Sequence, residues 1–148
     1  DWLGKDAARV ILPITDPYVV HHGALGSFAT AYLPADADVG QVLGRLRDVD
    51  GIILAVDKAD ACQRFELPQD RIGDLVVISG ENMTVGTSEH RHDLAALKEP
   101  LRSHGGLTEQ EVPFIVNRVM ADLPGAPDLR NFDAFFYAVR AAALQTNI

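Results

Sequence analysis

The sequence has only one cysteine, Cys62, and aromatic residues make up 7% of its 148 residues. A single cysteine cannot form a disulfide within the chain, which excludes a disulfide-stapled secreted scaffold. It fits a reducing compartment, so we expect a cytoplasmic protein in which Cys62 is a small core residue. Residues 1–5 show neither an initiator methionine nor a signal-peptide pattern, so we expect a piece of a longer protein.

Basic residues and long apolar runs are also scarce. The chain has 13 lysines and arginines against 21 aspartates and glutamates, and a formal net charge of −8. Phosphate backbones and anionic membranes repel such a surface, so nucleic-acid and membrane partners are disfavoured. No apolar run approaches the roughly 20 residues that a membrane-spanning helix needs. Hydrophobic residues still make up 47% of the chain, which is enough to build a buried core.

The motifs of several common enzyme classes are absent as well. There is no Gly-x-Ser-x-Gly elbow, which argues against a serine hydrolase of that type. There is no Walker loop and no dinucleotide-binding fingerprint, which disfavours P-loop and Rossmann enzymes. The residues left as candidates for chemistry are five histidines and the acidic pair Glu109 and Glu111. We interpret the two glutamates as charges that flank a strand.

The middle of the chain alternates between strand and helix patterns. A half-buried strand is predicted at 27–33. An amphipathic helix is predicted from Val39, and Asp36 or Asp38 can cap it. A second strand is predicted at 52–56. A short helix begins at Asp57 and a further strand covers 75–79. This β-α-β-α-β order predicts a compact α+β unit of ferredoxin-like character.

The flanking regions are predicted more sparsely. Strands are expected at 8–14 and 18–22, and an edge strand at 83–85. A helical turn is expected at 93–98. A further strand is expected at 111–117, where Pro113 interrupts it. A last helix follows Asn131 or Asp133, either of which can cap it. Its expected apolar face consists of Phe132, Phe135, Phe136, Val139 and Ala143.

His104 is the histidine best placed for chemistry because small residues surround it. Ser103 precedes it, and Gly105 and Gly106 follow, so the ring is left open and the backbone can adopt unusual angles. The alternative is a loop histidine that bonds to backbone. Zinc takes several histidine, aspartate or glutamate ligands, and no segment supplies an obvious set. A metal site built from this chain alone is therefore not expected.

The other histidines form two close pairs. His21 and His22 are adjacent, so on a strand their side chains face opposite ways. His90 and His92 would share one face if extended, a spacing that can bind zinc. The surroundings of this second pair are very polar, which favours a solvated loop over a metal site.

Three segments resemble the phosphonoacetate hydrolase family of the alkaline phosphatase superfamily. They are residues 8–27, 70–77 and 101–118, of which the last contains His104 and is the most specific. Together they span nearly the whole chain in the family's order. The resemblance implies an enzyme with two zinc ions that breaks the carbon–phosphorus bond of phosphonoacetate, giving acetate and phosphate.

The resemblance also implies roles for individual residues. His104 is the expected last zinc ligand, whereas the threonine nucleophile and the remaining metal ligands are expected upstream of this chain. His21, His22 and Ser27 are candidate contacts to a small-molecule phosphonate, because their loop joins the core to the cap. Without the upstream residues, the chain by itself is expected to be inactive.

The implied fold is α/β, with a partial alkaline-phosphatase-like core and an inserted ferredoxin-like α+β cap unit. Residues 1–23 would form a core segment, 24–85 the cap, and 86–148 a C-terminal core segment that carries His104. A competing hypothesis is a non-enzymatic module on the ferredoxin-like α+β unit, which binds a small ligand or dimerises. A homodimer is therefore one expected form of assembly.

Overall fold

The computed structural model divides the chain into two compact units, Asp1–Gln110 and Glu111–Ile148. It describes residues 2–4, 6–14, 25–88, 91–92, 98, 104–117 and 129–143. The predicted elements at 18–22 and 93–98 lie outside the described residues, apart from Lys98. No helix in the described part of the chain has the length and apolar character needed to cross a membrane.

The first unit is built on a four-stranded antiparallel sheet with the order β1-β3-β5-β4. The strands are β1 (Arg9–Ile11), β3 (Phe28–Tyr32), β5 (Leu75–Ser79) and β4 (Ile52–Asp57). β3 and β4 both run antiparallel to β5, so they are parallel to each other and enclose it. The predicted β-α-β-α-β order is confirmed, whereas the strand predicted at 8–14 is shorter.

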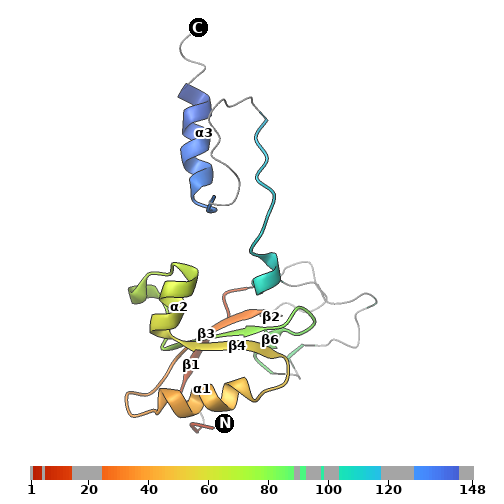
Figure 1. Cartoon of the computed structure of the whole chain (residues 1–148). Coiled ribbons are helices and arrows are strands. Elements are labelled where there is room, and N and C mark those ends of the chain that lie inside the picture. Colours follow the sequence, from red (N-terminus) through yellow and green to blue (C-terminus); the bar gives the residue numbers. More distant parts are fainter. Residues whose placement is uncertain are drawn as a thin grey trace. The chain divides into compact units, whose positions relative to one another are not determined.

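Two helices cover opposite faces of this sheet. Leu75 and Val77 on β5 pack in the same core cluster as α1 (Val39–Arg47), whereas Val76 and Ile78 pack in the cluster of α2 (Lys58–Phe65). Figure 1 shows α1 and α2 on the two sides of the strands. An α+β fold usually keeps its helices on one face. The fold is therefore mixed α/β, and it differs from the ferredoxin-like expectation in the position of α2.

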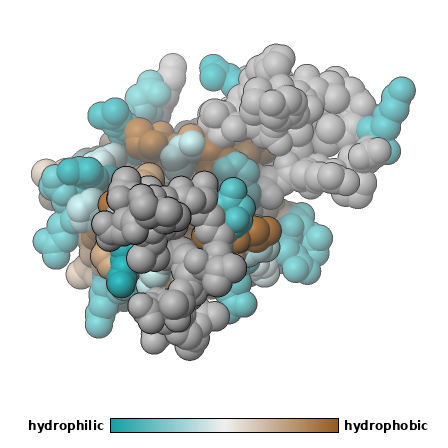
Figure 2. Space-filling view, turned by 90° about the horizontal axis from the view of Figure 1, so that it is seen from above, coloured by the Kyte–Doolittle hydropathy of each residue, from teal (hydrophilic) through white to brown (hydrophobic). Residues whose placement is uncertain are grey.

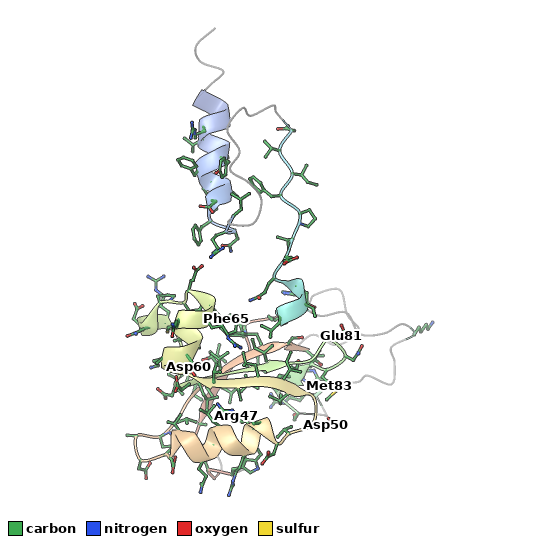
Figure 3. The ribbon with its side chains drawn as sticks, in the orientation of Figure 1. Arg47, Asp50, Asp60, Phe65, Glu81 and Met83 are labelled. Carbon is green, nitrogen blue, oxygen red and sulfur yellow. The ribbon has the colours of Figure 1, made fainter. Side chains whose placement is uncertain are left out.

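An aspartate caps the start of each helix, as the sequence predicts. The carboxylate of Asp38 accepts from the backbone N–H of Gln41 at 3.0 Å, and that of Asp57 accepts from Asp60 at 2.9 Å. These bonds satisfy backbone donors that a helix start leaves unpaired. At the other end of α1, Nε of Arg47 donates to the carbonyl of Ala55 on β4 at 3.0 Å, and Figure 3 shows Arg47 between α1 and the sheet.

A second sheet has two strands, and the first of these shortly precedes β3 in the sequence. β2 (Leu25–Gly26) pairs antiparallel with β6 (Val85–Gly86), which partly matches the edge strand predicted at 83–85. Ser27 is the single residue between β2 and β3. The chain therefore passes from the small sheet to the large one at Ser27.

Gly73 is a position where the backbone leaves no room for a side chain. Its N–H donates to Oγ1 of Thr30 at 2.8 Å, and that hydroxyl donates to the carbonyl of Leu75 at 3.0 Å. A Cβ at Gly73 would collide with the carbonyl of Ala31 and lie 2.6 Å from the Thr30 hydroxyl. The buried Thr30 therefore joins β3 to the start of β5 only if residue 73 is glycine.

We predict that Gly73→Ala lowers the free energy of unfolding by about 1–3 kcal/mol, the usual effect of overpacking. Urea unfolding of the protein measures it. Gly44→Ala is the matched control, because a Cβ at this α1 position meets nothing within 4 Å. Alanine should stabilise that helix by about 1 kcal/mol. Equal effects of the two substitutions would show that the Gly73 contact is unimportant.

Asp74 joins three elements of the first unit. Its Oδ2 accepts from the backbone N–H of Leu33 at 2.8 Å, and its Oδ1 lies 3.3 Å from Nζ of Lys58 at the start of α2. The Leu33 hydrogen bond is the main reason why the pKa of Asp74 is lowered, and Lys58 lowers the pKa further. Partial desolvation opposes this shift without cancelling it.

This lowered pKa predicts a stability profile in acid. The ionised Asp74 stabilises the folded state above the pKa of an unfolded aspartate, and the stabilisation is lost as the pH falls through the lower folded value. Asp74→Asn should be less stable than the wild type at neutral pH, and the two should converge in acid. Unfolding midpoints across this range test it. Parallel profiles would contradict a lowered pKa at Asp74.

The second unit contains helix α3 (Asp133–Ala143) and the segment 111–117. The predicted cap residue Asp133 accepts from the backbone N–H of Arg130 at 2.8 Å. The strand predicted at 111–117 is wrong, because no ladder partner pairs with it in the described part of the chain. Pro113 lacks an N–H to donate, which disfavours a ladder there.

The apolar residues predicted for the last helix are largely exposed. In this unit Tyr137 is 6% exposed, and its ring centroid lies 6.0 Å from Phe114 and 5.4 Å from Phe136. The four described residues of the predicted apolar face remain more than half exposed: Phe132, Phe135, Phe136 and Val139. Figure 2 shows brown apolar side chains at the surface among teal polar ones on the face viewed from above. The helix is confirmed, but the four described residues of its predicted face are not buried in a core.

Candidate functional site

His104 lies in the first unit, on a short segment that precedes the 3-10 helix η4 (Leu107–Glu109). Its residue is exposed, and no hydrogen bond or ion pair of the imidazole occurs among the described residues. The backbone of the same residue is held firmly, as the following contacts show. An exposed imidazole on an anchored backbone is accessible to a ligand.

The first contact joins His104 to the sheet at Ser27. The backbone N–H of Ser27 donates to the carbonyl of His104 at 3.0 Å, while the Ser27 carbonyl accepts from the N–H of Ser79 on β5 at 2.9 Å. Since the chain changes sheet at Ser27, its N–H is available to a third segment. The Ser27 residue is 5% exposed, so its backbone serves as an attachment point for the His104 segment.

The second contact packs the backbone of Gly105 against Ile14. Gly105 has a φ of +90°, in the left-handed region that favours glycine. A Cβ there would also collide with Cδ1 of Ile14, a residue that is 9% exposed. Two residues further on, Leu107 packs against the α2-side core cluster. The glycine after His104 is thus required by both backbone conformation and space.

The third contact closes the turn after the histidine. The backbone N–H of Gly106 donates to Oε2 of Glu109 at 2.6 Å, and the N–H of Glu109 donates back to the Gly106 carbonyl at 3.3 Å. Oε1 of Glu109 accepts from Oγ1 of Thr108 at 2.9 Å. Glu109 therefore caps a turn and does not flank a strand, which corrects the prediction. The spacing Gly106-x-x-Glu109 is that of a capping box and could have indicated this.

The other candidate residues differ in whether the structure describes them and in how deeply they are buried. His92 is 8% exposed, and its Nε2 accepts from the backbone N–H of Thr87 at 3.2 Å, so the solvated-loop interpretation is wrong for this residue. Nε2 of a neutral His92 therefore carries the lone pair, and Nδ1 the proton. His21, His22 and His90 lie outside the described residues. Cys62 packs partly buried against the α2-side core cluster, as predicted.

The described residues fit one zinc ligand but not a complete site. In the part of the chain that the structure describes, His92 and His104 included, no three histidine, cysteine, aspartate or glutamate side chains gather as metal ligands. His104 fits as a single ligand because its imidazole is exposed and a neutral imidazole is a common zinc donor. The buried Thr30 is 7% exposed with its hydroxyl bonded on both sides, which argues against a nucleophilic role.

Comparison with known proteins finds matches among solved structures. No family model matches the chain. Two of the solved structures with this fold are hydrolases. Both are phosphonoacetate hydrolase from Sinorhizobium meliloti 1021, one in complex with phosphonoacetate and one with phosphonoformate. Each matches 95% of this chain at 74% sequence identity with a TM-score of 0.78.

The match confirms the family resemblance seen in the sequence. This chain spans 34% of the length of the solved hydrolases, or about a third. It is therefore similar to one part of those enzymes, and the activity of the whole protein is a separate question. The segments on which the resemblance rests include the His104 turn, the best-anchored candidate site in the described residues.

Proposed function

We propose that this chain is part of a zinc-dependent hydrolase that cleaves the carbon–phosphorus bond of phosphonoacetate to acetate and phosphate. The observation that carries the proposal is 74% identity over 95% of the chain to a phosphonoacetate hydrolase. His104 is the proposed zinc ligand, one of a set whose other members, with the nucleophile, lie outside the described residues. The chain alone is proposed to be inactive.

Two zinc ions are proposed for the whole enzyme, where bound zinc would act as a Lewis acid on the phosphoryl oxygens. The contribution of this chain is to hold the imidazole of His104 in place by its backbone. Ser27 lies beside His104 through the 3.0 Å hydrogen bond, which supports its proposed position near the phosphonate. His21 and His22, which precede β2 in the sequence, stay proposed contacts to the phosphonate.

The domain arrangement is also a proposal. Residues 24–85 would form the inserted cap, between core segments 1–23 and 86–148. The parallel pair β3 and β4 around β5 supports the ferredoxin-like part of this proposal, since it is a split β-α-β unit. The opposite-face position of α2 is a difference within that cap. A cytoplasmic location is also proposed, and the single cysteine supports it. The proposed assembly is a homodimer.

Phosphate release from phosphonoacetate by the complete enzyme tests this function. We expect release to stop when a chelator removes the metal and to return when zinc is added. Phosphonoformate should compete, because it presents the same phosphonate and carboxylate groups. Release that is unaffected by metal removal would refute the zinc proposal, and no release at all would refute the activity. Ligand binding by this chain alone would favour the non-enzymatic alternative.

A further inference from the structure

The carboxylate of Glu109 makes two of the hydrogen bonds that hold the turn after His104. Its Oε2 accepts from the backbone N–H of Gly106 at the short distance of 2.6 Å. Its Oε1 is held in turn by the hydroxyl of Thr108 at 2.9 Å. Both oxygens of an exposed glutamate are therefore committed to the backbone and side chains of the turn that carries the histidine.

The same turn is fixed to the sheet on its other side. The carbonyl of His104 is bonded to Ser27, and Gly105 is pressed against Ile14 in a left-handed conformation. Gly106 is buried beyond these anchors, and its N–H finds its acceptor in Glu109. Removing the Glu109 carboxylate leaves the turn attached at Ser27 and closed only by the longer backbone bond from the Glu109 N–H to the Gly106 carbonyl at 3.3 Å.

We propose that Glu109 is a positioning residue that fixes the direction of the His104 imidazole toward zinc. This proposal rests on the proposed function and assigns Glu109 no contact with metal or substrate. Groups that orient a metal ligand from behind usually change metal affinity by 10- to 100-fold when they are lost. Glu109 bonds to Gly106, two residues beyond the proposed ligand, so an effect near the lower end is expected.

The test compares Glu109→Ala with Glu109→Gln in the complete enzyme. Glu109→Ala should speed zinc dissociation about tenfold, measured by transfer to a chromophoric chelator. It should also speed hydrogen exchange of the Gly106 amide. Glu109→Gln should restore most of both properties, because its amide oxygen can accept the same N–H. A Glu109→Ala enzyme with wild-type zinc dissociation would overturn the proposal.

Two further variants separate positioning from general damage. Glu111→Ala removes an exposed carboxylate two residues away, so it should leave zinc dissociation unchanged. Thr108→Ala removes only the hydroxyl that holds Oε1, and should shift dissociation in the same direction as Glu109→Ala by a smaller factor. If Glu109→Ala fails to fold, Thr108→Ala tests the proposal in its place. Equal losses in Glu109→Ala and Glu111→Ala would also refute a specific role for Glu109.

The proposed function is tested separately in the same assay. If the wild type holds zinc and His104→Ala loses it, the ligand assignment stands whatever Glu109 does. If His104→Ala retains zinc as the wild type does, the ligand assignment fails, and the positioning role of Glu109 fails with it. The exchange rate of the Gly106 amide reports the contact itself in either case.

Discussion

Replacing His104 by alanine is expected to remove zinc from the complete enzyme and to lower phosphate release by more than ~100-fold. Loss of a residue that merely supports a metal ligand already costs 10- to 100-fold, and loss of a ligand should cost more. The folded state should hardly change, because the His104 residue is exposed and no described contact involves its ring. Exposed substitutions usually alter stability by about 0.5 kcal/mol or less.

His92→Ala is expected to have the opposite effects, a loss of stability without a loss of zinc. Its imidazole is 8% exposed and accepts a backbone hydrogen bond from Thr87, so alanine should lower stability by about 1–3 kcal/mol. Zinc content per folded protein should stay unchanged. Zinc analysis and thermal unfolding of both variants give the comparison. Retention of zinc and activity in His104→Ala would refute the assignment of His104 as a metal ligand.

The regular elements of the first unit are readable from sequence because their signals are local. Asp38 and Asp57 stand directly before apolar periodic segments, and both cap the helices that follow. The predicted strand 75–79 begins with four apolar residues without alternation, which is typical of a strand covered on both faces. The structure gives β5 those bounds, and every residue in it is buried.

The features that sequence reasoning missed depend on contacts distant in the chain. The opposite-face position of α2 follows from which β5 residues it meets, and no local pattern specifies that. His92 is polar and its neighbours are polar, so its burial against Thr87 could not be read from composition. The exposed face of α3 shows the same limit, because a helical pattern predicts an apolar face but not what covers it.

In the candidate site too, some features could be predicted from local sequence and others could not. The glycines after His104 indicated an open ring, and Gly105 indeed needs its positive φ and the absence of a Cβ beside Ile14. The bond from Ser27 to the His104 carbonyl joins residues far apart in sequence, so it required the fold. Glu109 had a local signal, its spacing from Gly106, but the expected strand at 111–117 concealed it.

The second large effect is expected from truncating the central strand. Ile78→Ala should lower the free energy of unfolding by about 2–5 kcal/mol, the range for large-to-small changes in a packed core. Ile78 is 2% exposed on β5 and belongs to the cluster with Val56, Ala61, Ile72 and Val76. Its loss leaves a cavity between the sheet and α2 that close-packed neighbours can fill only partly.

Ile53→Ala is the matched control, since it deletes the same atoms from a neighbouring strand. Ile53 is 54% exposed and lies where the β4–β5 register shifts between Ile52 and Leu54. The irregularity directs Ile53 away from the core, so the change should cost about 0.5 kcal/mol or less. Urea unfolding measures the difference between the two alanine variants. Because their chemistry is identical, a large difference can arise only from burial, and similar losses would contradict β5 as a strand packed on both faces.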